Sequence, residues 1–338
     1  AVPVALPENQ GDVLAWAVAL AGLLQFLWLI LACRREGIEF RLVRPTLSPQ
    51  VKRLWKLMLP GLAGGGVMQI NLAIGTIIAS MFAGAVSYLY YADRIYQLPL
   101  GVVGVAIGVV LLPELTRRIR GGDEAGAMAS FNRAIEIAML LTLPATAALI
   151  AVPMPIVQVL FERGAFGPDA TRATALALTA YTAGLPAYVL VKALAPGFYA
   201  REDTATPFRY AIVAMVTNTV LGVGLAFLMG FVGIAIATSA AALLNAFLLA
   251  RRLRKTGLLK LDARLRRRLP RQLLASVIMA AMLWFLWIAK LEWFQAGIWL
   301  QLAGLGTLVV GGLSIYAGIG ILIGAFRVED LRSVVRRR

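Results

Sequence analysis

The stretch that decides the fold runs from Ser87 to Arg118 and reads SYLYYADRIYQLPLGVVGVAIGVVLLPELTRR. Its central part, residues 98–112, carries no charged side chain. Together with the residues in front of it, this part is long enough to cross a bilayer as a helix, at about 1.5 Å per residue. Asp93 and Arg94 lie side by side near its start. A charge that enters the membrane with a helix is costly, so we interpret this pair as functional. Pro113 and the basic residues after it are expected to end the helix.

The composition of the whole chain is that of a membrane protein. Of its 338 residues, 60% are hydrophobic and only 15% are charged, and the mean hydropathy is +0.80. Soluble domains carry about 25% charged residues. Apolar runs of roughly twenty residues recur along the chain, which is typical of membrane-spanning helices. We therefore predict an all-α fold, a polytopic helical membrane protein.

Nine membrane helices are expected from these apolar runs. They cover about residues 12–33, 60–83, 86–113, 130–152, 169–200, 207–229, 232–253, 272–289 and 297–325. The second is expected to begin at Pro60. The fifth contains Pro196 and Gly197, where a kink is expected because proline removes one backbone hydrogen bond.

The distribution of basic residues predicts the orientation of these helices. Loops 34–59, 114–129, 201–208, 251–271 and 326–338 alternate along the chain, and they hold seven, three, one, ten and five lysines and arginines. That is 26 of the 33 in the chain, an excess that marks cytoplasmic loops. The C-terminus is therefore expected in the cytoplasm and the N-terminus outside. Because this topology accounts for the net charge of +16, no nucleic-acid partner is expected.

The residue types present argue against catalysis. The chain has no histidine and a single cysteine, Cys33, which excludes Cys/His metal sites, disulfides within the chain and histidine-based catalysis. No paired carboxylates, nucleophile elbow or phosphate-binding glycine loop is recognisable. We expect no enzyme, no metal and no cofactor. Residues 1–12 do not begin with Met and lack the features of a signal peptide, so we interpret the chain as part of a longer protein.

Two cations inside apolar helices are the main candidates for function. Asp93 and Arg94 point about 100° apart on a helix and do not pair well with each other. Arg94 either faces a water-filled cavity and binds an anion, phosphate above all, or extends to the membrane interface beside the preceding tyrosines. Lys192, deep in the fifth predicted helix, is either functional or paired with a carbonyl, a carboxylate or water.

Polar and small residues inside the other apolar helices have two interpretations. Gln69, Asn71, Asn218 and Thr238 form hydrogen bonds between helices, or they line a cavity or an ion site. Two glycine pairs, Gly104 with Gly108 and Gly320 with Gly324, are interpreted as faces where helices approach closely.

Four stretches together resemble one known family. They are INLAIGTIIAS (70–80), YYADRIYQLPLGVVGVAIGVVLLPELTR (90–117), LFERGAF (160–166) and LVKALAPGFYAREDTATPFR (190–209). They resemble the lipid II flippase (MurJ/MviN) family, of the multidrug/oligosaccharidyl-lipid/polysaccharide exporter superfamily. Members have fourteen helices with both ends cytoplasmic, and this chain looks like helices six to fourteen.

The resemblance implies a flippase of the bacterial cytoplasmic (inner) membrane. Such a protein moves lipid II, the lipid-linked peptidoglycan precursor, from the inner to the outer leaflet by alternating access, for cell-wall synthesis and cell shape. The implied partners are lipid II, membrane lipids and the N-terminal helices that this chain lacks. Two alternatives stay open: a cation or drug antiporter of the same superfamily, and a non-transporting membrane scaffold for wall synthesis.

The resemblance also implies a division into three parts. Residues 1–59 would hold an external loop, the last helix of the N-terminal lobe and a cytoplasmic linker. Residues 60–254 would form the C-terminal six-helix lobe. Residues 255–338 would add two helices that form a groove for the lipid tail, followed by a basic cytoplasmic C-terminus. We expect four glycines to leave space for that groove: Gly304, Gly306, Gly311 and Gly312.

The residues expected to bind substrate follow from the same resemblance. Arg94 matches a cavity arginine that faces the lipid II diphosphate and sugars, with Asp93 beside it. Gln97 stands where many relatives have Glu, and with Lys192 it completes the predicted substrate-binding set.

The resemblance also bears on cation coupling. Some relatives bind sodium in this lobe, through positions that look like Gly75 and Gly222 here. Asn71, Asn218 and Thr238 remain as candidates for lining an ion site or the cavity, and coupling to a monovalent cation is left open.

Overall fold

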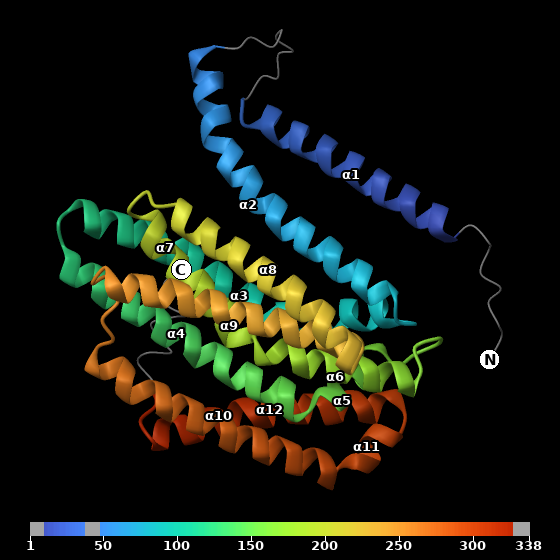
Figure 1. The fold of residues 1–338 in the computed structure, drawn as a ribbon. Helices are drawn as coiled ribbons and strands as arrows, with labels where there is room; N and C mark the ends of the chain where they lie inside the picture. The colour runs from blue at the N-terminus through green and yellow to red at the C-terminus, as the bar shows by residue number, and fades with distance from the viewer. Residues whose placement is uncertain (1–9, 38–47, 327–338) are drawn as a thin grey trace. The chain divides into compact units, whose positions relative to one another are not determined.

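The structure is a computed structural model that describes residues 10–37 and 48–326. The predicted external loop before Gln10, most of the predicted linker (38–47) and the basic C-terminal segment (327–338) lie outside the described residues. The described part is helical and contains no strand, as expected for an all-α protein (Figure 1).

The chain divides into two compact units, Ala1–Leu59 and Pro60–Arg338. In the first unit, α1 (Gln10–Arg35) is a single long apolar helix. Helix α2 (Pro49–Ser80) begins in the first unit and continues in the second. The three-part division predicted from the sequence stays a prediction.

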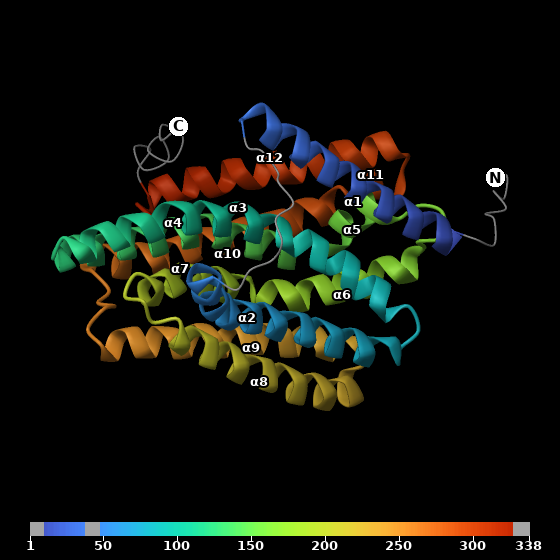
Figure 2. The same ribbon diagram turned by 90° about the horizontal axis from the view of Figure 1, so that it is seen from above.

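The second unit contains ten further helices in the described residues. They are α3 (Ala85–Arg120), α4 (Glu124–Ala151), α5 (Pro153–Phe161), α6 (Pro168–Ala183), α7 (Leu185–Tyr199), α8 (Ala205–Met229), α9 (Phe231–Lys255), α10 (Ala263–Ala289), α11 (Leu291–Gln295) and α12 (Ile298–Leu322). Helix α3 packs against α4, α6 and α7, and α9 packs against α6, α7 and α8. Helix α10 lies along α4 and α12, and α12 also contacts α5 and α11 (Figure 2).

The three larger groups of buried apolar side chains in this unit each join several helices. The first joins α3, α4, α7 and α9 around Leu115 and Phe131. The second joins α3, α6 and α9 around Leu178 and Ile234. The third joins α4, α10 and α12 around Met279. Because lipid tails are as apolar as these side chains, close packing rather than exclusion of water stabilises such helix contacts in a membrane.

Seven helical stretches of the described part are long and apolar enough to cross a membrane, by length and composition. They are Ala15–Arg35, Glu124–Ala151, Pro168–Tyr199, Ala205–Met229, Phe231–Lys255, Ala263–Ala289 and Ile298–Leu322. Each overlaps one of the nine predicted membrane helices. Helices α2 and α3 are not among the seven, and Gln69–Ser80 is a shorter apolar helix. That α2 and α3 also cross the membrane stays a prediction.

The predicted start of the second helix at Pro60 was wrong. Helix α2 begins at Pro49 and continues through Pro60. Its first turn is capped by Ser48, whose hydroxyl accepts a hydrogen bond from the Val51 N–H at 3.3 Å. Proline is favoured in the first turn of a helix, so Pro49 and Pro60 were equally good start signals in the sequence.

The predicted end of the third helix at Pro113 was also wrong. Helix α3 continues to Arg120. The carboxylate of Glu114 pairs with Arg118 one turn later at 3.0 Å and accepts a hydrogen bond from Ser130 of α4 at 3.0 Å. These contacts compensate for the backbone hydrogen bond that proline removes.

The predicted fifth helix is two helices, α6 and α7, which meet at Gly184. A Cβ atom at this position would lie 2.7 Å from the Cα and Oγ atoms of Ser239 in α9, so only glycine allows α9 to approach this closely. The Ser239 hydroxyl donates hydrogen bonds to the carbonyl oxygens of Ala180 at 2.6 Å and Tyr181 at 3.1 Å. Ser239 therefore satisfies carbonyl groups at the end of α6.

The kink expected at Pro196 and Gly197 stays a prediction. Helix α7 runs through Pro196 and Gly197 to Tyr199. The two short helices α5 and α11 were not predicted. The expectation that Gly320 and Gly324 form one helix face was wrong, because Gly324 follows the end of α12 with a φ of +67°. The surroundings of Gly108 lie outside what the structure describes.

Four glycines of α12 were expected to leave space for a lipid-tail groove, and at two of them the space is filled by other side chains. A Cβ atom at Gly304 would lie 2.9 Å from the Phe294 ring, and one at Gly312 would lie 3.2 Å from the Leu283 side chain. These glycines let α12 pack against α11 and α10, so the expectation was wrong for both. Gly306 has no atom within 4 Å of its Cβ position, and Gly311 has the Leu286 side chain at 4.0 Å.

Candidate functional site

The first turns of α3 present Arg94 on an exposed face. Its guanidinium lies over the ring of Tyr90, one turn earlier, at 4.7 Å from the ring centroid. This is a cation–π contact, which holds the side chain without neutralising its charge. Arg94 thus remains able to bind an anion. That it faces a cavity stays a prediction.

Asp93 and Arg94 form no ion pair with each other in the described part of the chain, as their positions on the helix predict. The Asp93 carboxylate is half-buried and accepts a hydrogen bond from the Gln97 side-chain amide one turn later. Gln97 therefore interacts with Asp93, whereas Arg94 contacts Tyr90. Asp93 and Arg94, which were predicted together as a functional pair, therefore each contact a different residue of α3.

Aromatic contacts with neighbouring parts of the chain fix the rotation of α3. The ring of Tyr96 stacks on Tyr181 of α6 and on Tyr188 of α7, with ring centroids 5.3 and 5.7 Å apart. Tyr91 contacts the rings of Phe161 and Phe166 at 4.7 and 5.2 Å. Since these rings are held against other helices, the Arg94 face of α3 is turned outward.

Lys192 reaches α3 from α7. The end of its side chain lies over Gly104, where a Cβ atom would be 2.5 Å from the lysine Cδ and 3.0 Å from Nζ. The side chain is exposed, and no carbonyl or carboxylate of the described residues lies within hydrogen-bond distance of Nζ. The expected carbonyl or carboxylate partner of Lys192 is thus not found in the described part of the chain.

The candidate ion-lining residues interact mainly with protein groups. The Asn218 side chain in α8 donates a hydrogen bond to the Asn71 side-chain oxygen in α2 at 2.8 Å. Thr238 donates to the Ile234 carbonyl of its own helix at 2.8 Å. The geometry favours helix–helix hydrogen bonding at Asn71 and Asn218. Within the described residues, no group of three or more His, Cys, Asp or Glu side chains could hold a metal ion.

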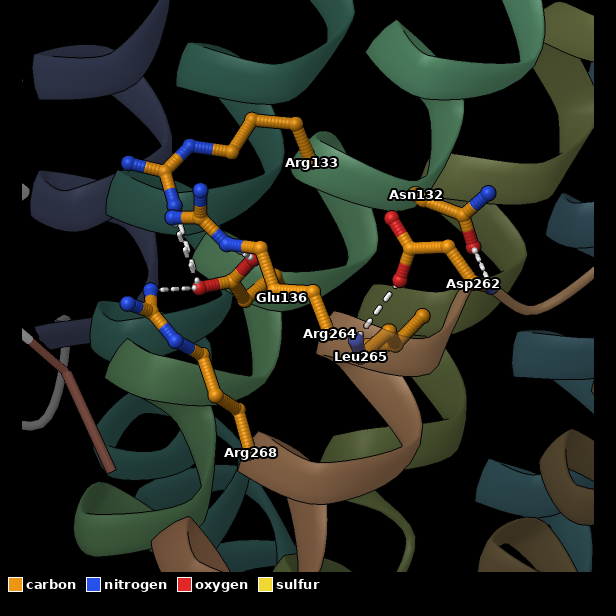
Figure 3. Close-up of polar contacts among 7 residues, drawn as sticks. All are labelled: Asn132, Arg133, Glu136, Asp262, Arg264, Leu265 and Arg268. Carbon is orange, nitrogen blue, oxygen red and sulfur yellow. Dashed lines mark hydrogen bonds and ion pairs between the residues drawn. The ribbon is translucent and has the colours of Figure 1, made fainter. Parts of the chain in front are cut away.

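A cluster of charged residues that the sequence analysis did not single out joins α4 to α10 (Figure 3). The buried carboxylate of Glu136 pairs with three guanidinium groups, those of Arg133 at 3.0 Å, Arg264 at 3.0 Å and Arg268 at 2.5 Å. Buried charges require such partners. The cluster fixes the start of α10 against α4.

The same cluster continues into the segment between α9 and α10. The Asn132 side chain donates to the Lys260 carbonyl at 2.8 Å and accepts from the Asp262 N–H at 3.4 Å. Asp262 in turn caps α10 by accepting a hydrogen bond from the Leu265 N–H at 2.6 Å (Figure 3). Glu136 and two of its arginine partners lie far apart in the sequence. The only sequence signal for the cluster was therefore an acidic residue inside an apolar helix, which needs a basic partner somewhere in the chain.

A small pocket of about 40 Å³ opens between α3, α4, α7 and α9. Its wall is mostly apolar, and Arg201 lies 3.6 Å from Glu124 among its lining residues. None of the predicted site residues lines this pocket. The predicted cations instead lie along α3 and α7, where exposed positive charge suits binding of an anion.

Comparison with known proteins identifies what the chain is similar to. The family model described as "Lipid II flippase MurJ" matches residues 2–303. A probable lipid II flippase MurJ of Rhizobium meliloti is 44% identical over 96% of this chain and 61% of its own length. The corresponding protein of Vibrio cholerae is 38% identical, over 95% of this chain and 61% of its own length. The chain thus spans about three fifths of these relatives.

Solved structures share the fold. A lipid II flippase MurJ in an inward closed conformation matches with a TM-score of 0.64 and 24% identity, over 87% of this chain and 57% of that one. An outward-facing multidrug transporter of the MATE family and the MOP superfamily matches with a TM-score of 0.51 and 17% identity, over 82% of this chain and 66% of that one. At these identities, the likeness is one of fold.

Proposed function

The chain belongs to the lipid II flippase MurJ family, and from this premise we propose that it moves lipid II across the bacterial cytoplasmic membrane. The proposed substrate is a lipid-linked peptidoglycan precursor, carried from the inner to the outer leaflet by alternating access. The process would serve cell-wall synthesis. The family is one of transporters, and we propose no catalytic step.

The observation that carries this proposal is the exposed guanidinium of Arg94 in α3, just ahead of the uncharged run 98–112. Tyr90 holds it in place without pairing its charge. A planar guanidinium binds phosphate with two parallel hydrogen bonds, which suits the diphosphate of lipid II. Asp93 and Gln97 pair with each other beside it and would bind sugar hydroxyl or amide groups. Lys192 completes the proposed substrate-binding set.

The orientation and the lipid-tail groove belong to the same proposal. The excess of basic residues in alternate loops supports a cytoplasmic C-terminus. Helices α10 and α12 would border a lateral groove for the lipid tail, because a polyprenyl chain in water would cost about 0.8 kcal/mol per CH₂. The open surroundings of Gly306 and the half-exposed Gly311 are compatible with such a groove.

The other expectations have less support. Coupling to a monovalent cation is not favoured, because Asn71 and Asn218 bind each other. A drug or cation antiporter is not favoured either, because a cation substrate would require acidic residues where α3 exposes Arg94. The remaining helices of a full-length flippase are proposed partners of this chain.

Replacement of Arg94 tests the function directly. The full-length protein carrying Arg94→Ala should fail to support growth of a bacterium depleted of its own lipid II flippase. In reconstituted vesicles its transport rate should fall roughly 10- to 100-fold, the loss expected for a charged hydrogen bond of about 1.5–3 kcal/mol. Arg94→Lys should retain part of the rate.

The matched control is Arg172→Ala, which removes an exposed arginine of α6 and should leave transport unchanged. A scaffold protein would tolerate both substitutions. Normal growth and transport with Arg94→Ala would therefore refute the proposal.

A further inference from the structure

One face of α3 connects the two cations. Arg94, Gln97, Gly101 and Gly104 follow one another at intervals of three, four and three residues, which places them along one side of the helix. Helix α7 packs beside α3, and Lys192 of α7 covers Gly104. Arg94, Gln97 and Lys192 are exposed. The face therefore begins with one cation and ends with another.

Gly104 determines where the second cation lies. The Lys192 side chain occupies the volume that any larger residue at position 104 would need, with its Cδ 2.5 Å, its Nζ 3.0 Å and its Cε 3.2 Å from the Cβ position. Because position 104 is glycine, the lysine stem can lie flat against α3. Its ammonium group is thereby held on the Arg94 side of α3.

The two cations are too far apart to form one clamp. Ten residues separate Arg94 from Gly104, which corresponds to roughly 15 Å along a helix. The Arg94 guanidinium also lies over Tyr90, on the side away from Gly104. A diphosphate is much shorter than this separation, so it can contact only one of the two cations at a time.

We propose that Lys192 is a second phosphate-binding position on the path of the lipid headgroup, and that Gly104 is the residue that positions it. This inference rests on the proposed flippase function. The ligand class is the diphosphate of a polyprenyl-linked substrate. Lys192 lies nearer the end of α7 at Tyr199, which leads to loop 201–208, one of the loops expected in the cytoplasm. With the proposed orientation, Lys192 meets the diphosphate on the cytoplasmic side, and Arg94 meets it later.

Binding of undecaprenyl diphosphate tests the two positions. The probe lacks sugar and peptide, and the full-length protein would be held in phosphatidylcholine nanodiscs, whose lipids carry no net charge. Arg94→Ala and Lys192→Met should each weaken binding by a few fold, because the other position remains. The double variant should bind at least tenfold more weakly than either single variant. Transport of lipid II should fall at least about tenfold in each single variant.

Gly104→Ala tests the positioning role without removing a charge. The three atoms nearest to its new methyl group all belong to the flexible end of Lys192, so the protein should fold normally while lipid II transport falls as in Lys192→Met. In a Lys192→Met background, Gly104→Ala should have no further effect. Gly224→Ala in α8 is the matched control, because no atom lies within 4 Å of its Cβ position and it is not on this face of α3, so transport should be unchanged.

The outcomes separate this inference from the proposed function. If Arg94→Ala weakens probe binding and Lys192→Met does not, the second position is refuted and the flippase function stands. If the double variant binds the probe as well as the weaker single variant does, both cations contact the same diphosphate at once. The proposal that the diphosphate meets Lys192 first and Arg94 later is then wrong. If Lys192→Met weakens binding of lipid II but not of the probe, Lys192 binds the sugar or the peptide and not the phosphate. If the wild-type protein neither binds the probe nor transports lipid II, the proposed function itself fails.

Discussion

At the scale of single residues, Tyr90 holds the side chain on which the proposed function depends. An exposed cation–π contact stabilises by about 0.5–1 kcal/mol, which corresponds to roughly a two- to fivefold change in an equilibrium or a rate. We therefore expect Tyr90→Leu to slow lipid II transport about two- to fivefold, less than Arg94→Ala. Vesicle transport assays at saturating lipid II would measure the difference.

Tyr90→Phe is the control for this prediction, because phenylalanine keeps the aromatic face and loses only the hydroxyl group. It should transport nearly as fast as the wild-type protein. Equal losses in Tyr90→Phe and Tyr90→Leu would show that the hydroxyl, and not the ring, matters.

Among the residues of the charged cluster between α4 and α10, Glu136 is the one whose replacement should destabilise the fold most. Its buried carboxylate lies among the guanidinium groups of Arg133, Arg264 and Arg268. Removing one member of a buried ion pair costs about 3–5 kcal/mol. Because Arg133 and Arg264 reach solvent, we expect Glu136→Gln to cost about 3 kcal/mol and to lower the midpoint of thermal unfolding in detergent by several degrees.

The comparison for this variant is Glu124→Gln, since the Glu124 side chain is 77% exposed and its pairing with Arg201 should contribute little. A Glu136→Gln protein that unfolds at the wild-type temperature would mean that the cluster does not stabilise the contact between α4 and α10.

At the scale of helices, the junction of α6 and α7 depends on one glycine and one serine. At Gly184 a methyl group would meet the backbone of Ser239 at 2.7 Å, and backbone cannot move aside cheaply. We expect Gly184→Ala to reduce the yield of folded protein strongly. Ser239→Ala should cost about 1–3 kcal/mol, because carbonyl groups lose their buried hydrogen-bond donor.

Chromatography of the detergent-solubilised protein and its thermal unfolding would measure both effects. Gly306→Ala is the matched control, as its Cβ position has no neighbour within 4 Å. Wild-type stability in Gly184→Ala would contradict the close approach of α9 at this junction.

The sequence predicted most helices because each membrane-spanning run is a long local signal. Its errors came where the structure is decided by residues far away in the chain. Pro113 was read as a helix end, but Ser130 of the next helix supports Glu114 beyond it. The long fifth helix was expected to be unbroken because nothing near Gly184 reveals that Ser239 packs there.

The same distinction applies to the site. The contact of Arg94 with Tyr90 and that of Asp93 with Gln97 each span one helical turn, so both lie within the range of sequence patterns. The pairing of Glu136 with Arg264 and Arg268 joins residues 128 and 132 positions apart. No local pattern predicts such a cluster, because its members meet only when α4 and α10 pack.

At the scale of the whole molecule, the proposed groove between α10 and α12 can be tested with a bulky residue. Gly311→Trp should block lipid II transport without reducing the amount of folded protein, because Gly311 is half-exposed and has only the Leu286 side chain nearby. Gly312→Trp should instead prevent folding, since its Cβ would lie 3.2 Å from Leu283. Transport and folded yield, measured together, distinguish the two.

Unchanged transport in Gly311→Trp, with normal yield, would mean that the lipid tail does not pass this part of α12. The two helices would then only brace the remainder of the second unit.

The Glu136 cluster has a consequence for how the chain is made. Arg264 and Arg268 lie at the start of α10, and they reach Glu136 only if α10 enters the membrane in the direction opposite to that of α9. An inverted α10 would carry both arginines to the far side of the bilayer from Glu136. The cluster thus makes the free energy of folding depend on the direction in which α10 is inserted. A chain in which α10 and α12 are inserted the wrong way round would be less stable than the correctly inserted one.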